Sequence, residues 1–95
     1  MFKDFELRIE SLNDGACRLG ISRPTAYVQM SDHLLPPTIA TGKRGQGFLV
    51  HEIDAIIAAR AIGTSDDELK NLVKRLVDGR KGLLDNKWAN NPLID

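Results

Sequence analysis

Apolar and polar positions along the 95-residue chain predict several short helices and a few short extended stretches. Residues 5–9, FELRI, alternate apolar and polar side chains, which predicts a strand. A first helix is expected from about Asp14 to Leu19, with Asn13-Asp14 at its N-terminal cap. Gly20 follows at the position where a helix often ends in a residue with positive φ.

A second helix is expected to begin after Ser22, a good N-cap, with Pro24 in its first turn, where no N–H is needed. It extends to about residue 32 or 33, and Pro36-Pro37 stop it. Three apolar residues recur every four positions on its inner side: Ala26, Met30 and Leu34. The tight turn before Ser22 therefore joins two short helices.

Residues 38–50, TIATGKRGQGFLV, predict a β-hairpin with strands at 38–40 and 48–50. The glycine-containing tip between them carries Lys43 and Arg44. A third helix is expected at about His51 to Ala61, and Gly63 ends it.

The fourth helix is predicted by the capping-box spacing of Ser65 and Glu68 and by an apolar stripe. The stripe consists of Leu69, Leu72, Val73, Leu76 and Val77. Two alternatives remain open: the stripe packs on the core of the same molecule, or it forms an intermolecular surface. The helix frays near residues 79–82, and residues 83–95 are expected to be loosely ordered, with Trp88 either anchoring the tail or contacting a partner.

This order of elements is that of a winged helix-turn-helix, a mainly α fold with a small β-hairpin, here followed by an extra C-terminal amphipathic helix. Residues 1–63 are expected to form the winged domain, residues 64–82 the added helix and residues 83–95 the tail. In such a fold the second helix enters the DNA major groove and the hairpin reaches adjacent phosphates or the minor groove.

Composition then limits the classes of function. Thirteen Lys and Arg balance thirteen Asp and Glu, so the formal net charge is zero and only a local patch can favour DNA. Between residues 18 and 47, four cations (Arg18, Arg23, Lys43 and Arg44) face a single acid, Asp32. So few cations predict modest affinity per monomer, and several copies or a partner would be needed.

Candidate chemistry of other kinds is sparse. The single cysteine, Cys17, excludes an internal disulfide, and His33 and His51 have no second ligand at metal spacing. The carboxylates form no facing pair, so we expect no enzyme, no metal and no cofactor. The chain shows neither a signal core nor an apolar run of 18 residues, which predicts a cytoplasmic, nucleoid-associated protein with no membrane partner.

Three stretches resemble the AlpA-type phage regulators, winged-helix proteins related to MerR-like DNA-binding domains and to excisionases. They are RLGISRPTAY (18–27), LLPP (34–37) and FLVHEIDAIIAAR (48–60). The family pattern has Gly-Leu-Ser-Arg-x-Thr-x-Tyr at the turn, then a proline, a basic wing, an aromatic residue and Glu-[Ile/Val]-Asp-Ala. Matching positions here are Gly20, Ser22, Arg23, Thr25, Tyr27, Pro36, Phe48, Glu52, Ile53, Asp54, Ala55 and Arg60.

The chain departs from this pattern at three places within residues 7–62, the span of the resemblance. Val28 stands where a basic residue is usual, His33 where a glycine is common, and Phe48 where tryptophan is usual. Histidine tolerates positive φ better than most residues, so the turn at 33 is expected to survive. Residues 64–95 have no assigned counterpart.

Eight side chains are the predicted DNA-binding set, each weighed against an ordinary surface or core role: Ser22, Arg23, Thr25, Tyr27, Gln29, Lys43, Arg44 and Gln46. Ser22 is equally a helix cap, and Gln29 is equally on the wrong face to contact adenine. A separate candidate protein interface comprises Leu69, Leu72, Val73, Leu76 and Trp88.

The resemblance implies a sequence-specific DNA-binding protein of a mobile element or prophage. Its expected role is transcriptional regulator, recombination directionality factor (excisionase), or both, binding and bending DNA with several copies. The implied partners are double-stranded DNA, further copies of the chain in a homo-oligomer or cooperative array, and a tyrosine recombinase (integrase). The alternative is a protein-interaction adaptor that works through the C-terminal helix without binding DNA.

Overall fold

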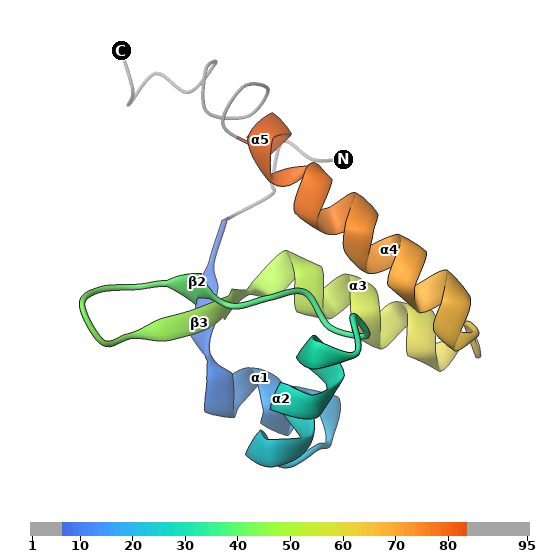
Figure 1. Cartoon of the computed structure of the whole chain (residues 1–95), viewed down its shortest axis with the longest axis horizontal. Coiled ribbons are helices and arrows are strands. Elements are labelled where there is room, and N and C mark those ends of the chain that lie inside the picture. Colours follow the sequence, from blue (N-terminus) through green and yellow to red (C-terminus); the bar gives the residue numbers. More distant parts are fainter. Residues whose placement is uncertain (1–6, 84–95) are drawn as a thin grey trace.

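The computed structural model describes residues 7–83, in which helices pack around a small antiparallel sheet (Figure 1). The predicted mainly helical class with a small β element is confirmed. In chain order the elements are β1 (Ile9–Ser11), α1 (Leu12–Leu19), α2 (Arg23–Ser31), β2 (Ile39–Ala40), β3 (Gln46–Leu49), α3 (Val50–Ala61), α4 (Asp66–Asp78) and α5 (Arg80–Gly82).

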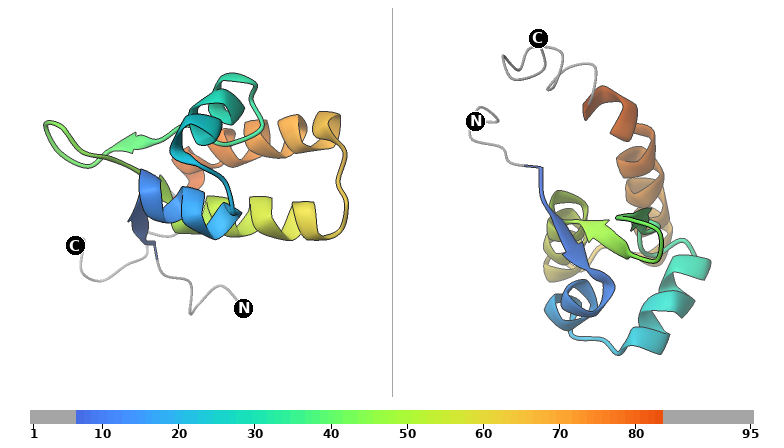
Figure 2. Two further views of the ribbon diagram at one scale, coloured as in Figure 1. Left: turned by 90° about the horizontal axis from the view of Figure 1, so that it is seen from below. Right: turned by 90° about the vertical axis from the view of Figure 1, so that its left-hand side faces the viewer.

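The sheet has three strands in the order β1-β3-β2, with both neighbours antiparallel to β3. Ile9 pairs with Leu49, and Ile39 pairs with Gly47. Of the strand predicted at 5–9, Ile9 lies in β1 but residues 7 and 8 do not, because pairing with β3 selects residues 9–11. Residues 5 and 6 lie outside the described residues. The β2–β3 hairpin projects well beyond the helices in two perpendicular views (Figures 1 and 2).

Helix α1 begins two residues earlier than predicted. The hydroxyl of Ser11, not a side chain at 13 or 14, accepts the backbone N–H of Asp14 at 3.0 Å and caps the helix. The earlier start places Leu12 in the core, where it is 3% exposed. Gly20 has φ of 74°, which confirms the predicted left-handed helix end.

Helix α2 begins as predicted and ends at Ser31, with Asp32 as its C-cap. Ser22 accepts the N–H of Thr25 at 3.3 Å. The helix ends through His33, whose φ is 62°, so Pro36-Pro37 are not what stops it. The N–H of Leu34 then donates to the carbonyl of Gln29 at 2.8 Å, and the chain turns back into the core.

Phe48 lies at the centre of the core, 1% exposed, and α1 approaches it closely. A Cβ added at Gly15 would lie 2.5 Å from Cδ2 of the Phe48 ring, so this glycine is required by packing. The buried cluster draws on α1, α2, the 32–38 segment, β3, α3 and α4, and its members are Leu12, Ala16, Ala26, Leu35, Phe48, Ile53, Ile56, Leu69 and Val73.

Helix α4 packs on this core, the first of the two alternatives that the sequence left open. Leu69 and Val73 are 3% and 5% exposed, and Leu72, Leu76 and Val77 pack against the same cluster. Ser65 caps the helix as predicted, accepting the N–H of Glu68. The predicted fraying near residues 79–82 is replaced by the short turn of α5.

Candidate nucleic-acid interface

The orientation of α2 follows from Ala26, which is fully buried against the core. Successive helix residues rotate by about 100°, so residues two positions away lie about 200° from Ala26, on the outer side. Pro24 and Val28 occupy these outermost positions, and Val28 is 59% exposed. The outer side of α2 is therefore exposed to solvent.

Arg23 lies at the first position of α2, and its guanidinium group hydrogen-bonds to side chains of both α1 and α2. Its Nη1 donates to Oδ1 of Asn13 at 3.0 Å, and its Nη2 donates to the hydroxyl of Tyr27 at 3.4 Å. The guanidinium carbon lies 5.8 Å from the centre of the Tyr27 ring, within cation–π range. The guanidinium group is thus exposed, and its contacts with Asn13 and Tyr27 fix its orientation.

Tyr27 joins α2 to the hairpin. Nε2 of Gln46 donates to its hydroxyl oxygen at 2.8 Å, and the hydroxyl of Thr38 donates to Oε1 of Gln46 at 2.9 Å. A phenol oxygen has two acceptor sites and one proton, so Arg23 and Gln46 leave that proton available for an external acceptor. Tyr27 is 41% exposed, which argues against a plain core tyrosine.

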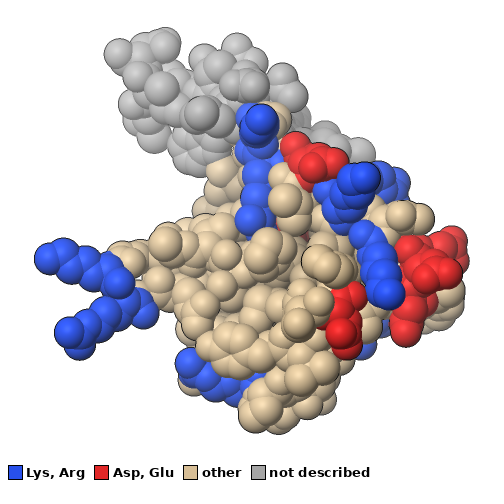
Figure 3. Space-filling model, viewed as in Figure 1, with Lys and Arg blue, Asp and Glu red and all other residues tan. Residues whose placement is uncertain are grey.

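The hairpin tip carries Lys43 and Arg44, both exposed. The N–H of Thr41 donates to the carbonyl of Gly45 at 3.0 Å and closes the loop behind them. Figure 3 shows Lys and Arg side chains extending beyond the body of the molecule at the hairpin end. They are the most protruding charges of this face.

The remaining predicted residues are Ser22, the N-cap of α2, and Thr25 and Gln29 within the helix. Ser22 donates its hydroxyl proton to Thr25 at 2.9 Å, so both are engaged at the helix start. Gln29 accepts from Nη2 of Arg60 on α3 at 2.6 Å, on the flank of α2 away from the hairpin. The structure therefore connects Arg23, Tyr27 and Gln46 and places Gln29 apart from them.

Arg18 does not contribute a free charge to this face. It donates to both carboxylate oxygens of Glu10, at 2.8 and 2.6 Å, and to Asp54 at 2.7 Å. These hydrogen bonds raise the pKa of Arg18 above its usual value. Counting it with the local positive charge was wrong, because Glu10 and Asp54, two acids outside residues 18–47, pair with it in the fold.

An ion pair between the buried Glu52 and Arg80 was not predicted from the sequence. Glu52 is 1% exposed and accepts from Nε and Nη2 of Arg80 at 2.8 and 2.6 Å. Arg80 also donates to the carbonyl of Pro37 at 2.8 Å, and its hydrogen bonds to Glu52 raise its pKa despite partial burial. No local signal could have found it, since the partners are 28 residues apart.

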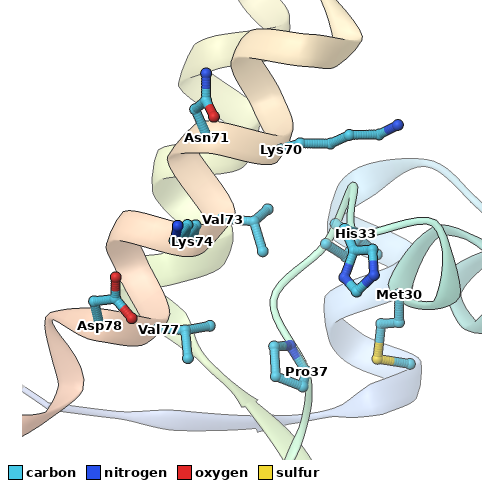
Figure 4. A pocket seen from close by; sticks show the side chains of 10 residues that line it. Met30, His33, Pro37, Lys70, Asn71, Val73, Lys74, Val77 and Asp78 are labelled. Carbon is cyan, nitrogen blue, oxygen red and sulfur yellow. The ribbon is translucent and has the colours of Figure 1, made fainter.

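An apolar groove of about 560 Å³ lies between α4 and the segment that leaves α2 (Figure 4). Met30, His33 and Pro37 form one wall, and Val73 and Val77 form the other. Lys70, Lys74 and Asp78 stand on the α4 side. Of the predicted interface residues, Val73 lines this groove, and Trp88 lies outside the described residues.

Comparisons with protein-family models, curated proteins and solved structures found no match for this chain. Within residues 7–83, no three His, Cys, Asp or Glu side chains are grouped so that they could hold a metal ion. In the same range no helix has the length and apolar character needed to cross a membrane.

Proposed function

We propose that the chain is a winged helix-turn-helix DNA-binding protein, with α2 as the recognition helix and the β2–β3 hairpin as the wing. The observation that carries the proposal is the hydrogen-bond chain from Arg23 through Tyr27 and Gln46 to Thr38. It fixes the first turn of α2 relative to the hairpin, so that one rigid surface presents both a helix and a basic tip. Such preorganisation suits a groove flanked by phosphates.

The charges on this surface have distinct roles in the proposal. Arg23 pairs with a guanine edge or a phosphate, the Tyr27 hydroxyl donates to a phosphate oxygen, and Lys43 and Arg44 contact phosphates beyond the helix. Three cations neutralise at most about three phosphates, which gives a salt slope of log affinity near −3. A single copy then binds weakly, which supports action in several copies.

The biological role rests on the resemblance to AlpA-type regulators. We propose a regulator or excisionase of a mobile element or prophage, acting with several copies on DNA and with a tyrosine recombinase. A directionality factor bends DNA and contacts the recombinase, whereas a regulator needs only its operator. Both roles use the same groove-facing surface.

The test is fluorescence anisotropy with duplexes from the attachment and promoter regions of the element, at low salt. The variant Arg23→Ala/Lys43→Ala/Arg44→Ala is expected to lose at least tenfold in affinity, because it removes the cations of the proposed face. The control is Lys70→Ala/Lys74→Ala/Lys81→Ala, which removes three exposed cations from α4 and α5. Affinity like that of the wild type in the first variant would reject the proposed face.

The second candidate function is a protein-interaction adaptor. The groove between α2 and α4 favours it, because a partner's apolar side chain could enter between Val77 and Pro37. The zero net charge and the apolar Val28 on the outer side of α2 also favour it. The two candidates differ in one measurement: a DNA reader loses affinity steeply with salt, whereas an adaptor shows no binding even at low salt.

A further inference from the structure

The outermost positions in the first two turns of α2 are Pro24 and Val28, which present carbon rather than hydrogen-bonding groups. Val28 points away from the buried Ala26 and is more than half exposed. Pro24 lies one turn earlier on the same side, and Thr25, which has a side-chain methyl, is an exposed residue of the same helix. In a helix that enters a groove, the outermost positions are the part that approaches the bases most closely.

Three polar side chains of α2 have hydrogen-bond partners within the molecule. Gln29 accepts from Arg60 on one flank, and Tyr27 accepts from Gln46 on the other. Arg23 donates to Asn13 at the start of the helix. A glutamine–adenine pair would compete with the 2.6 Å bond from Arg60 to Gln29, whereas the exposed side chain of Val28 can contact a base edge without giving up a hydrogen bond.

Among the base edges of the major groove, only thymine offers an apolar group, its C5-methyl. We infer that Val28, assisted by the methyl of Thr25, recognises thymine methyl groups, so that the preferred duplex carries thymines at the centre of the contacted major groove. The inference rests on the proposed DNA binding and specifies its substrate. It also assigns a function to the position where the resembling family usually has a basic residue.

The experiment uses duplexes that the full chain enriches from a random pool at low salt. Each thymine of the enriched motif is replaced by deoxyuridine, which removes the methyl and leaves base pairing unchanged. Loss of one buried methyl contact is expected to weaken binding roughly fourfold, the equivalent of one buried CH₂. The full chain is measured on both duplexes at several salt concentrations.

Val28→Ala is the matching protein variant, because alanine keeps the helix and removes only the two methyl groups. We expect it to bind the thymine duplex several-fold more weakly and to discriminate little between thymine and deoxyuridine. Ile62→Ala is the control, since Ile62 is 84% exposed but lies after α3, and it should discriminate as the wild type does.

Three results would overturn the inference: an enriched pool without thymines, equal binding of both duplexes by the wild type, or full discrimination by Val28→Ala. If salt-sensitive binding persists in any of these cases, the proposed DNA-binding function stands and only the thymine contact fails. If the chain binds neither duplex at low salt, the proposed function fails and the inference fails with it.

Discussion

The backbone of His33 decides how α2 ends. Its φ of 62° lies in the left-handed region, where a side chain with a Cβ is strained by about 1–2 kcal/mol. Gly20 has a similar φ of 74° at the end of α1, without that strain. The two short helices of the proposed DNA-binding unit thus end in the same conformation with different residues.

Substitutions at these two positions should change the free energy of unfolding in opposite directions. His33→Gly is expected to raise the free energy of unfolding by about 0.5 kcal/mol, because relief of strain exceeds the added freedom of the unfolded chain. Gly20→Ala should lower it by about 0.5–1 kcal/mol through strain alone, since an added Cβ meets nothing within 4 Å. Urea unfolding measures both, and a less stable His33→Gly would show that the imidazole makes contacts worth more than the strain.

At the scale of elements, α5 is held to α3 by the ion pair of Arg80 and Glu52. Glu52 lies in the first turn of α3 and is buried, so the pair must satisfy a carboxylate that water cannot reach. Arg80 adds a bond to Pro37, in the segment between α2 and β2. One side chain from the C-terminal extension therefore fixes two parts of the proposed winged domain.

Removing only Arg80 from this ion pair should lower the free energy of unfolding more than removing both Arg80 and Glu52. Arg80→Met is expected to lower the free energy of unfolding by about 3 kcal/mol, because Glu52 is then left as a buried charge without its cation. Glu52→Met/Arg80→Met should recover much of that loss, since a buried apolar pair of similar volume is tolerated. Lys81→Met, an exposed neighbour, serves as the control and should change stability by less than about 0.5 kcal/mol. A double variant no more stable than Arg80→Met would contradict this account.

The elements themselves were predictable where local signals set them. Ser22, Gly20 and Ser65 mark their helix ends through side-chain or backbone chemistry within a few residues, and the structure confirms all three. The first strand was misplaced because its bounds come from pairing with β3, almost 40 residues away. The start of α1 was misplaced because three polar residues compete for one cap, and the burial of Leu12 favours Ser11.

The candidate site was predictable in its residue types but not in its connections. The sequence placed Arg23, Tyr27 and Gln46 in one set, yet the Gln46–Tyr27 bond spans 19 residues and depends on how the hairpin lies beside α2. Arg18 and Gln29 were also expected at this face, but the fold pairs them with residues outside the predicted set. Their partners, Asp54 and Arg60, both come from α3. Long-range partners of charged side chains decide which of them remain free, and no periodicity reveals those partners.

At the scale of the whole molecule, the described residues 7–83 share a buried core that α4 completes. Leu69 and Val73 belong to the same buried cluster as Phe48 and Ile53, although the resemblance to AlpA-type regulators ends near residue 62. A domain of this size has only about 5 kcal/mol of stability to lose. We therefore expect the C-terminal extension to be required for folding, because α4 covers part of this core.

A chain ending at Gly63 should fail to fold cooperatively, because it exposes the core beneath α4 and leaves Glu52 without Arg80. Leu69→Ala in the full chain is the graded form of this test and should lower the free energy of unfolding by about 2–5 kcal/mol. Leu72→Ala, on a partly buried position of the same stripe, should lower it by about 1 kcal/mol. Urea unfolding and size exclusion on the same samples separate packing from association. If the shortened chain stays folded and monomeric while the full chain dimerises, α4 serves chiefly as an interface between copies. If Leu69→Ala alone unfolds the monomer, the main role of α4 is to complete the core of its own molecule.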